Sequence, residues 1–273
     1  MRSTLASTAK YSSLVVASIA TLLPLVVIVM ASLKTAREFQ TTGPFTLPTS
    51  LGLDNYVTAF TSGRMALGFL NTTIILVVSI AGTVVIGAMT AYAIDRFEFR
   101  FKKAVVGLFL LATLVPGVTT QVATFQVINN LGLYNSRWAP IALFMGTDIV
   151  SIYIFLQFVR SIPRELDEAA MLEGANKLTV FRKIIFPLLK PAIATVVIIK
   201  GIAVYNEFYI PWLYMPSRDL PVISTSLFRF TGPFGAHWEV IAAGVIIVII
   251  PTLVVFLALQ RFIYNGFTSG ATK

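Results

Sequence analysis

The sequence has no cysteine and one histidine, His237, in 273 residues. Without cysteine the chain has no disulfides and no thiolate chemistry, and a single histidine is too few for a histidine-based metal site. Charge is also scarce, because charged residues make up only 12% of the chain while hydrophobic residues make up 56%. A soluble domain carries about twice that share of charge. The mean hydropathy of +0.83 therefore indicates an integral membrane protein with several spans.

Motifs for nucleotide binding and for catalysis are missing as well. No G-x-x-x-x-G-K-[ST] loop is present to hold the phosphates of ATP. The sequence offers no nucleophile paired with a base and no pair of carboxylates placed to face a cavity. We therefore expect a chain that is not an enzyme and that binds no cofactor or metal of its own.

Six segments are long and apolar enough for a membrane-spanning helix, which needs about 20 residues. We expect these spans at about 14–33, 65–94, 104–128, 138–159, 188–212 and 240–260. Pro24, Pro116 and Pro251 fall within them, where neighbouring helices can satisfy the backbone groups that a proline leaves free. The predicted fold is all-α, with one membrane domain over residues 1–273.

The distribution of lysine and arginine predicts the orientation in the membrane. If the N-terminus is cytoplasmic, the inner segments hold 14 of the 21 basic residues and the outer segments hold 6. The positive-inside rule then places both termini in the cytoplasm. The net charge of +9 is mostly this topology signal, so we expect contact with membrane lipid and no binding of nucleic acid.

With this topology the longest cytoplasmic connection is the 160–187 loop, which is unusually polar for this chain. Its acids at 165, 167 and 168 fit the first turn of a helix, where the helix dipole favours negative charge. Gly174 suits the end of that helix, and Asn176 can cap a second one. Pro187 predicts that the second helix ends at about Ile185. From charge and periodicity alone, an amphipathic helix on the membrane surface explains the loop equally well.

The order of residues in the 160–187 loop favours a more specific interpretation. Glu168-Ala169-Ala170, Gly174 and then Ile184-Ile185-Phe186-Pro187 resemble the signature E-A-A-x3-G, followed after nine residues by I-x-L-P, of the inner-membrane permeases of ABC importers. Phe186 replaces the usual leucine, and the spacing matches throughout. The motif lies before the penultimate expected span, which is its place in that family.

The resemblance covers nearly the whole chain and is closest to the smaller permease subunit of the maltose-type, carbohydrate-uptake group. The stretches that carry it are AYAIDRFEFRFKK (91–103), NNLGLYNS (129–136), VYNEFYIPW (204–212) and the tail FTSGATK (267–273). It implies the type I importer permease fold in a bacterial inner membrane, with six transmembrane helices and a cytoplasmic coupling helix.

The resemblance also implies partners and roles. In that family the E-A-A loop docks into a groove of a cytoplasmic ATPase, so the ATPase-coupling residues here would be Glu168, Ala169, Ala170, Gly174 and Pro187. The tail would reach between two ATPase subunits, which bind the ATP and Mg²⁺. A second permease chain would complete a heterodimer. An external solute-binding protein would deliver the sugar, and the outer loop 215–239 would contact that binding protein.

Two charged residues lie inside expected spans, Asp148 in the fourth and Lys200 in the fifth. Each is about 10 residues from a span end, which places it roughly 15 Å deep. An unpaired charge at that depth costs on the order of 2.5–3.5 kcal/mol on insertion scales. They can pair with each other as a structural element, or they can line the translocation path.

Tyr205, Asn206 and Glu207 form a polar and aromatic group in the fifth span. An aromatic belt at the membrane interface explains the tyrosine. The amide and the carboxylate are costly to bury without partners, so a role in the translocation path is the second interpretation.

The leading prediction is a permease subunit that forms half of the path for a sugar or oligosaccharide. The same machinery could instead import glycerol phosphate or another polyol derivative. A secondary transporter is the remote alternative, although such proteins show repeated halves and broken helices, and we find no similarity between halves here.

Overall fold

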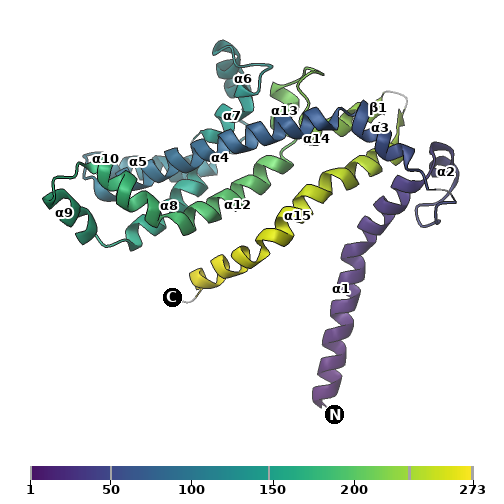
Figure 1. The fold of residues 1–273 in the computed structure, drawn as a ribbon, viewed down its shortest axis with the longest axis horizontal. Helices are drawn as coiled ribbons and strands as arrows, with labels where there is room; N and C mark the ends of the chain where they lie inside the picture. Colours follow the sequence, from purple (N-terminus) through teal and green to yellow (C-terminus); the bar gives the residue numbers. More distant parts are fainter. Residues whose placement is uncertain (1, 50, 147, 233–234, 272–273) are drawn as a thin grey trace. The chain divides into compact units, whose positions relative to one another are not determined.

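The computed structural model describes residues 2–49, 51–146, 148–232 and 235–271. These residues are mostly helical (Figure 1). The exception to the all-α prediction is a hairpin in which β1 (Thr231–Gly232) pairs antiparallel with β2 (Gly235–Ala236). The chain divides into two compact units, one of Met1–Gly68 with Ile223–Leu259 and one of Phe69–Val222 with Gln260–Lys273.

The first unit is built on two long apolar helices. They are α1 (Arg2–Leu33) and α15 (Trp238–Ala271), of which α15 belongs to this unit as far as Leu259. Shorter elements accompany them: α2 (Ala36–Thr41), α3 (Asp54–Ser62), α14 (Ile223–Ser226), the 3-10 helix η2 (Leu227–Phe230) and the hairpin. The outer loop that the sequence predicts over 215–239 is therefore partly structured.

The second unit contains the 160–187 loop and the helices that flank it. Its longest helix is α4 (Met65–Arg96), which enters this unit at Phe69. The others before the loop are α5 (Lys102–Leu114), α6 (Gln121–Asn130), α7 (Trp138–Met145) and α8 (Ile149–Ser161). The loop and the chain after it form α9 (Glu165–Leu172), α10 (Lys177–Val180), the π-helix η1 (Phe181–Ile185), α11 (Phe186–Leu188), α12 (Lys190–Asn206) and α13 (Tyr209–Tyr214).

The main apolar core of the second unit joins α4 and α8 to the end of the 160–187 loop. Ala88 and Ala91 of α4, Phe155 of α8 and Ile185 of η1 are all fully buried in it. A methyl group at Gly87 would lie 3.1 Å from a ring carbon of Phe155, so α4 and α8 approach closely. Small residues that allow such approach are what tight packing between membrane helices requires.

Three helices of the described chain are long and apolar enough to cross a membrane unbroken. They are Lys10–Leu33, Met65–Arg96 and Trp238–Leu257, and the number rises to as many as five if each of two bent helix pairs is one span. One bent pair joins α7 to α8, and the other joins Lys177–Leu188 to α12. The first, second and sixth expected spans thus correspond to single helices, whereas the count of six stays a prediction.

The third expected span, 104–128, is not a single helix in the structure, and its crossing of the membrane stays a prediction. The segment divides into α5 and α6, with the break after Leu114. Pro116 disfavours helical geometry at the residue before it, and Val115 is accordingly extended, with φ −81° and ψ 116°. Pro24 and Pro251, by contrast, lie inside α1 and α15, as expected.

The fourth and fifth expected spans are also interrupted. The fourth (138–159) bends by 41° between α7 and α8. The fifth (188–212) is divided between α12, which ends at Asn206, and α13, which begins at Tyr209. Each interruption lies beside charged residues that the sequence singles out, which are Asp148 in the fourth span and Glu207 in the fifth.

Candidate functional site

The 160–187 loop folds into two short helices joined by a tight turn, as its sequence predicts. α9 carries Glu165, Asp167 and Glu168 in its first turn, the favoured end for acids. The side-chain oxygen of Asn176 accepts a 2.8 Å hydrogen bond from the backbone N–H of Thr179 and so caps α10. Figure 1 shows α9 and α10 together at one end of α4.

The turn between the two helices depends on Gly174. Its φ is +88°, a left-handed conformation that side chains with a Cβ disfavour. The Gly174 N–H bonds the Met171 carbonyl and the Ala175 N–H bonds the Ala170 carbonyl, each at 3.0 Å. These two bonds form a Schellman motif, which fixes where α9 ends and how the chain continues into α10.

Replacing Gly174 with alanine is expected to destabilise this turn by about 1–2 kcal/mol, because alanine pays the left-handed penalty. No atom outside the turn would obstruct the added methyl group, so the cost comes from the backbone alone. Gly174→Asn is the matched control, since asparagine tolerates this conformation better. Thermal unfolding of the detergent-purified variants should rank glycine above asparagine and asparagine above alanine. Equal midpoints for all three would contradict this account.

Pro187 does not end the second helix at Ile185, as the sequence suggested. The helix instead widens into the π-helical turn η1, in which the Phe186 N–H bonds the Phe181 carbonyl. Pro187 then lies in α11, which continues the same helical run from Lys177 to Leu188. The chain turns only after this, with a bend of 71° between Lys177–Leu188 and α12.

The outward side of α9 is both acidic and apolar. Glu168 and Ala169 are exposed, and Leu172 is 90% exposed. Ala170 differs from its neighbour, because it packs against the core of the second unit.

Sequence reasoning missed the contact that holds this loop to α4. The side chains of Arg96 and Asp167 are only 7% and 8% exposed, and the Arg96 Nε lies 2.7 Å from the Asp167 Oδ2. The Arg96 Nη2 also donates to the Ile162 carbonyl at 2.8 Å. The only signal in the sequence was the Asp95-Arg96 pair at the end of an apolar run. That pair gives no indication that Arg96 contacts Asp167, 71 residues away.

Asp148 and Lys200 lie together, as one of the two interpretations expected. The Lys200 Nζ lies 2.9 Å from the Asp148 Oδ2, and the hydroxyl of Ser151 donates to the same oxygen at 2.8 Å. The pair joins α12 to the residue that precedes α8. Its ionic and hydrogen-bonding needs are therefore largely met within the chain.

The group at Tyr205, Asn206 and Glu207 lies at the break between α12 and α13. The Glu207 Oε1 accepts hydrogen bonds from the N–H groups of Tyr209 and Ile210 at 2.8 and 3.1 Å, so this carboxylate caps α13. The Asn206 amide donates to the Ile202 carbonyl at 2.9 Å. Both polar side chains thus contact local backbone, and their role in a translocation path stays a prediction.

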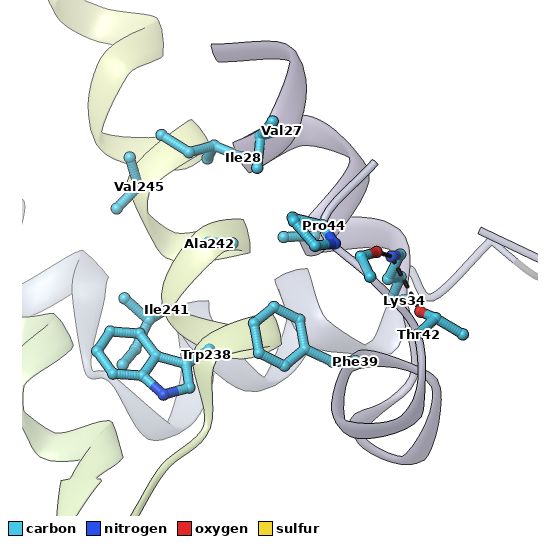
Figure 2. Close-up of a pocket in the computed structure, with 12 residues that line it drawn as sticks. Val27, Ile28, Lys34, Phe39, Thr42, Pro44, Trp238, Ile241, Ala242 and Val245 are labelled. Carbon is cyan, nitrogen blue, oxygen red and sulfur yellow. Dashed lines mark hydrogen bonds between the residues drawn. The ribbon is translucent and has the colours of Figure 1, made fainter. Parts of the chain in front are cut away.

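A separate pocket of about 410 Å³ lies in the first unit, between α1, the chain that follows it and α15 (Figure 2). Its walls are mainly apolar, with Phe39 and Trp238 among them. Lys34 is buried beside it and donates to Thr42 and to the Gly43 carbonyl. None of the site residues expected from the sequence lines this pocket.

Part of the expected tail contact falls outside the described residues. The tail 267–273 includes residues 272 and 273, which the structure does not describe. Its predicted position between two ATPase subunits therefore stays a prediction.

Comparison with protein families places most of the chain in one group. The model described as "Binding-protein-dependent transport system inner membrane component" matches residues 83–268. The "multiple sugar-binding transport system permease protein MsmG" of Streptococcus mutans is 33% identical over 97% of this chain and 96% of the relative. The "melibiose/raffinose/stachyose import permease protein MelC" of Bacillus subtilis is 29% identical over 92% of this chain and 91% of the relative.

Solved structures of low identity show that the fold is shared. A chain of a bacterial ABC transporter for import of the acidic polysaccharide alginate superposes with a TM-score of 0.80 at 19% identity, over 94% of this chain and 96% of that one. A chain of a bacterial alginate transporter bound to a pentasaccharide-loaded periplasmic protein gives a TM-score of 0.63 at 20% identity, over 96% and 97%.

Proposed function

Because the chain belongs to the family of binding-protein-dependent transport system inner membrane components, we propose that it is a permease subunit of an ATP-driven importer of a sugar or oligosaccharide. It is a multi-pass membrane protein with the type I importer permease fold, and it is a non-catalytic subunit. In this role it forms half of the path along which the substrate crosses the membrane.

The observation that carries the substrate class is the similarity to sugar permeases over almost the whole chain. Relatives named for melibiose, raffinose and stachyose, for multiple sugars and for arabinooligosaccharides each match at least 92% of it. Import of glycerol phosphate is not favoured by these names. A secondary transporter is not favoured either, because the family depends on binding proteins and carries a loop suited to an ATPase.

The 160–187 loop is the part of the chain through which we propose that ATP hydrolysis is coupled to transport. Glu168 supplies an exposed carboxylate and Ala169 an exposed small side chain on α9. Gly174 sets the turn, whereas Ala170 packs against the core of the second unit and Pro187 lies in α11, just before α12. The loop packs on the core of α4 and α8, so a displacement of α9 is transmitted to these membrane helices.

This role requires partners of stated kinds. Two ATPase subunits bind ATP and Mg²⁺, a second permease chain completes the path, and an external solute-binding protein delivers the substrate. Both termini then lie in the cytoplasm, as the basic residues predict.

Purification of the tagged chain from its native membrane in mild detergent tests the proposal. We expect an ABC ATPase and a second permease to copurify, and a strain that lacks the chain to lose uptake of at least one labelled oligosaccharide. The strain should regain uptake when the chain is restored. Purification of the chain without any ATPase, or unchanged uptake of every sugar tried, would overturn the proposal.

A further inference from the structure

Asn71, near the start of α4, holds a distant segment in place. Its side chain is fully buried, its amide nitrogen donates to the Pro221 carbonyl at 2.6 Å, and its amide oxygen accepts from the Arg137 Nε at 2.8 Å. Buried amides with both groups bonded fix their partners in one geometry. Asn71 thereby joins α4 to the start of α7 and to the 215–222 segment, which precedes Ile223.

Further contacts fasten the same segment. The Asn135 N–H bonds the Tyr214 carbonyl at 2.9 Å, and the Asn135 side chain accepts from the Ser217 N–H at 3.1 Å. Met215 and Val222 are buried against Ile75 of α4. The 215–222 segment therefore follows α4 if that helix shifts.

Arg96, the last residue of α4, holds the 160–187 loop at the other end. Its side chain is 7% exposed, and Nε and Nη1 form ion pairs of 2.7 Å with Asp167 and Asp95. Nη2 donates to the Ile162 carbonyl. All three guanidinium nitrogens are bonded, so the planar fork fixes orientation as well as charge.

The helix between these two contacts is continuous. Asn71 and Arg96 are 25 residues apart, which is roughly 38 Å along an α-helix. α4 contains no proline, and breaks separate α5 from α6, α7 from α8 and α12 from α13. Among the elements described in the second unit, α4 alone runs without a break from the contacts of Asn71 to the contacts of Arg96.

We propose that α4 acts as a rigid link between the 215–222 segment and the 160–187 loop, with Asn71 and Arg96 as its positioning residues. This inference rests on the proposed function, because the 215–222 segment then faces the solute-binding protein and α9 faces the ATPase. A displacement of the segment moves α4 along or about its axis, and Arg96 passes that motion to α9 through Asp167.

A double-mutant cycle in the complete reconstituted importer, with its solute-binding protein, tests the link. Asn71→Asp removes the donor to Pro221, and Arg96→Lys keeps the charge but removes the fork. Each is expected to leave basal ATP hydrolysis within about twofold of wild type and to lower its stimulation by the loaded binding protein about fivefold or more. Exposed matched controls, Asn130→Asp and Arg100→Lys, should retain full stimulation.

The stimulation of ATP hydrolysis in the double variant decides whether the two residues act through one link. Where one variant already abolishes transmission through the link, the second removes no further stimulation, whereas independent local effects multiply. Multiplied losses, parallel loss of basal and stimulated hydrolysis, or stimulation equal to wild type in the single variants would overturn the inference. If a variant does not assemble, Arg137→Lys and Asp167→Asn repeat the cycle from the partner side of each contact.

The failure of this inference is distinguishable from the failure of the proposed function. If a wild-type complex with an ATPase shows no stimulation by any binding protein, the proposed function and this inference both fall. If wild type is stimulated and the cycle is multiplicative, only the link through α4 is wrong.

Discussion

Glu168→Lys is expected to remove the ATPase from the purified complex and to reduce substrate uptake to the background of a strain without the chain. The carboxylate of Glu168 is exposed on α9, where the proposed function places an ATPase groove. In the variant, the hydrogen-bond donor of the ATPase that would contact the Glu168 carboxylate faces the positively charged lysine instead. Loss of one partner of such a charge pair costs about 2–5 kcal/mol at an interface, which weakens binding at least about thirtyfold.

Two further variants separate this contact from other effects of charge. Glu173→Lys makes the same charge change at an exposed position beyond the end of α9 and should retain the ATPase. Glu168→Gln keeps the hydrogen-bonding oxygen and should give an intermediate loss. Equal loss with Glu173→Lys would show that general repulsion, and not a contact of Glu168, governs assembly. Retention of the ATPase by Glu168→Lys would remove Glu168 from the coupling surface.

Lys200→Met alone, and Asp148→Leu alone, should each destabilise the chain strongly. Each leaves one charge of a largely buried pair without its partner, and breaking such a pair typically costs about 3–5 kcal/mol. We expect low yields of monodisperse protein and clearly lower unfolding midpoints for both single variants. A single variant as stable as wild type would contradict the pairing that the 2.9 Å contact indicates.

The double variant Asp148→Leu, Lys200→Met decides between the two interpretations of the pair. Replacing both charges with apolar residues of similar size is often neutral for stability, so the double variant should recover most of the loss. If the pair is structural, uptake recovers with stability. A double variant that is stable but transports nothing would instead place the pair in the translocation path.

Features of local origin were the ones that the sequence predicted well. The turn at Gly174 and the cap at Asn176 each depend on one residue type and its neighbours within four positions. Backbone conformation and side-chain reach decide such features, and both are properties of the residue itself. The sequence signature from Glu168 to Pro187 likewise located the 160–187 loop.

The contacts that fix the loop within the fold could not be predicted in this way. Asn71 donates a hydrogen bond to the Pro221 carbonyl across 150 positions. Every residue has a backbone carbonyl, so the sequence cannot indicate which one serves as the acceptor. Arg96 and Asp167 are ordinary charges until packing buries them. The effect of proline on the helices could not be predicted for a different reason. The same steric rule applies to Pro116 and Pro187, yet only Pro116 follows a helix end. At Pro187 the π-helical turn η1 accommodates the ring and the helix continues.

The exposed face of α9 also bears on how a cell handles this chain before it is assembled. Burying a leucine such as Leu172, which is 90% exposed here, gains about 1.5–3 kcal/mol. Until a partner covers Leu172, this apolar side chain stays in water and that stabilisation is not gained. If the proposed function holds, we therefore expect less of the chain to accumulate in cells that lack the partner ATPase.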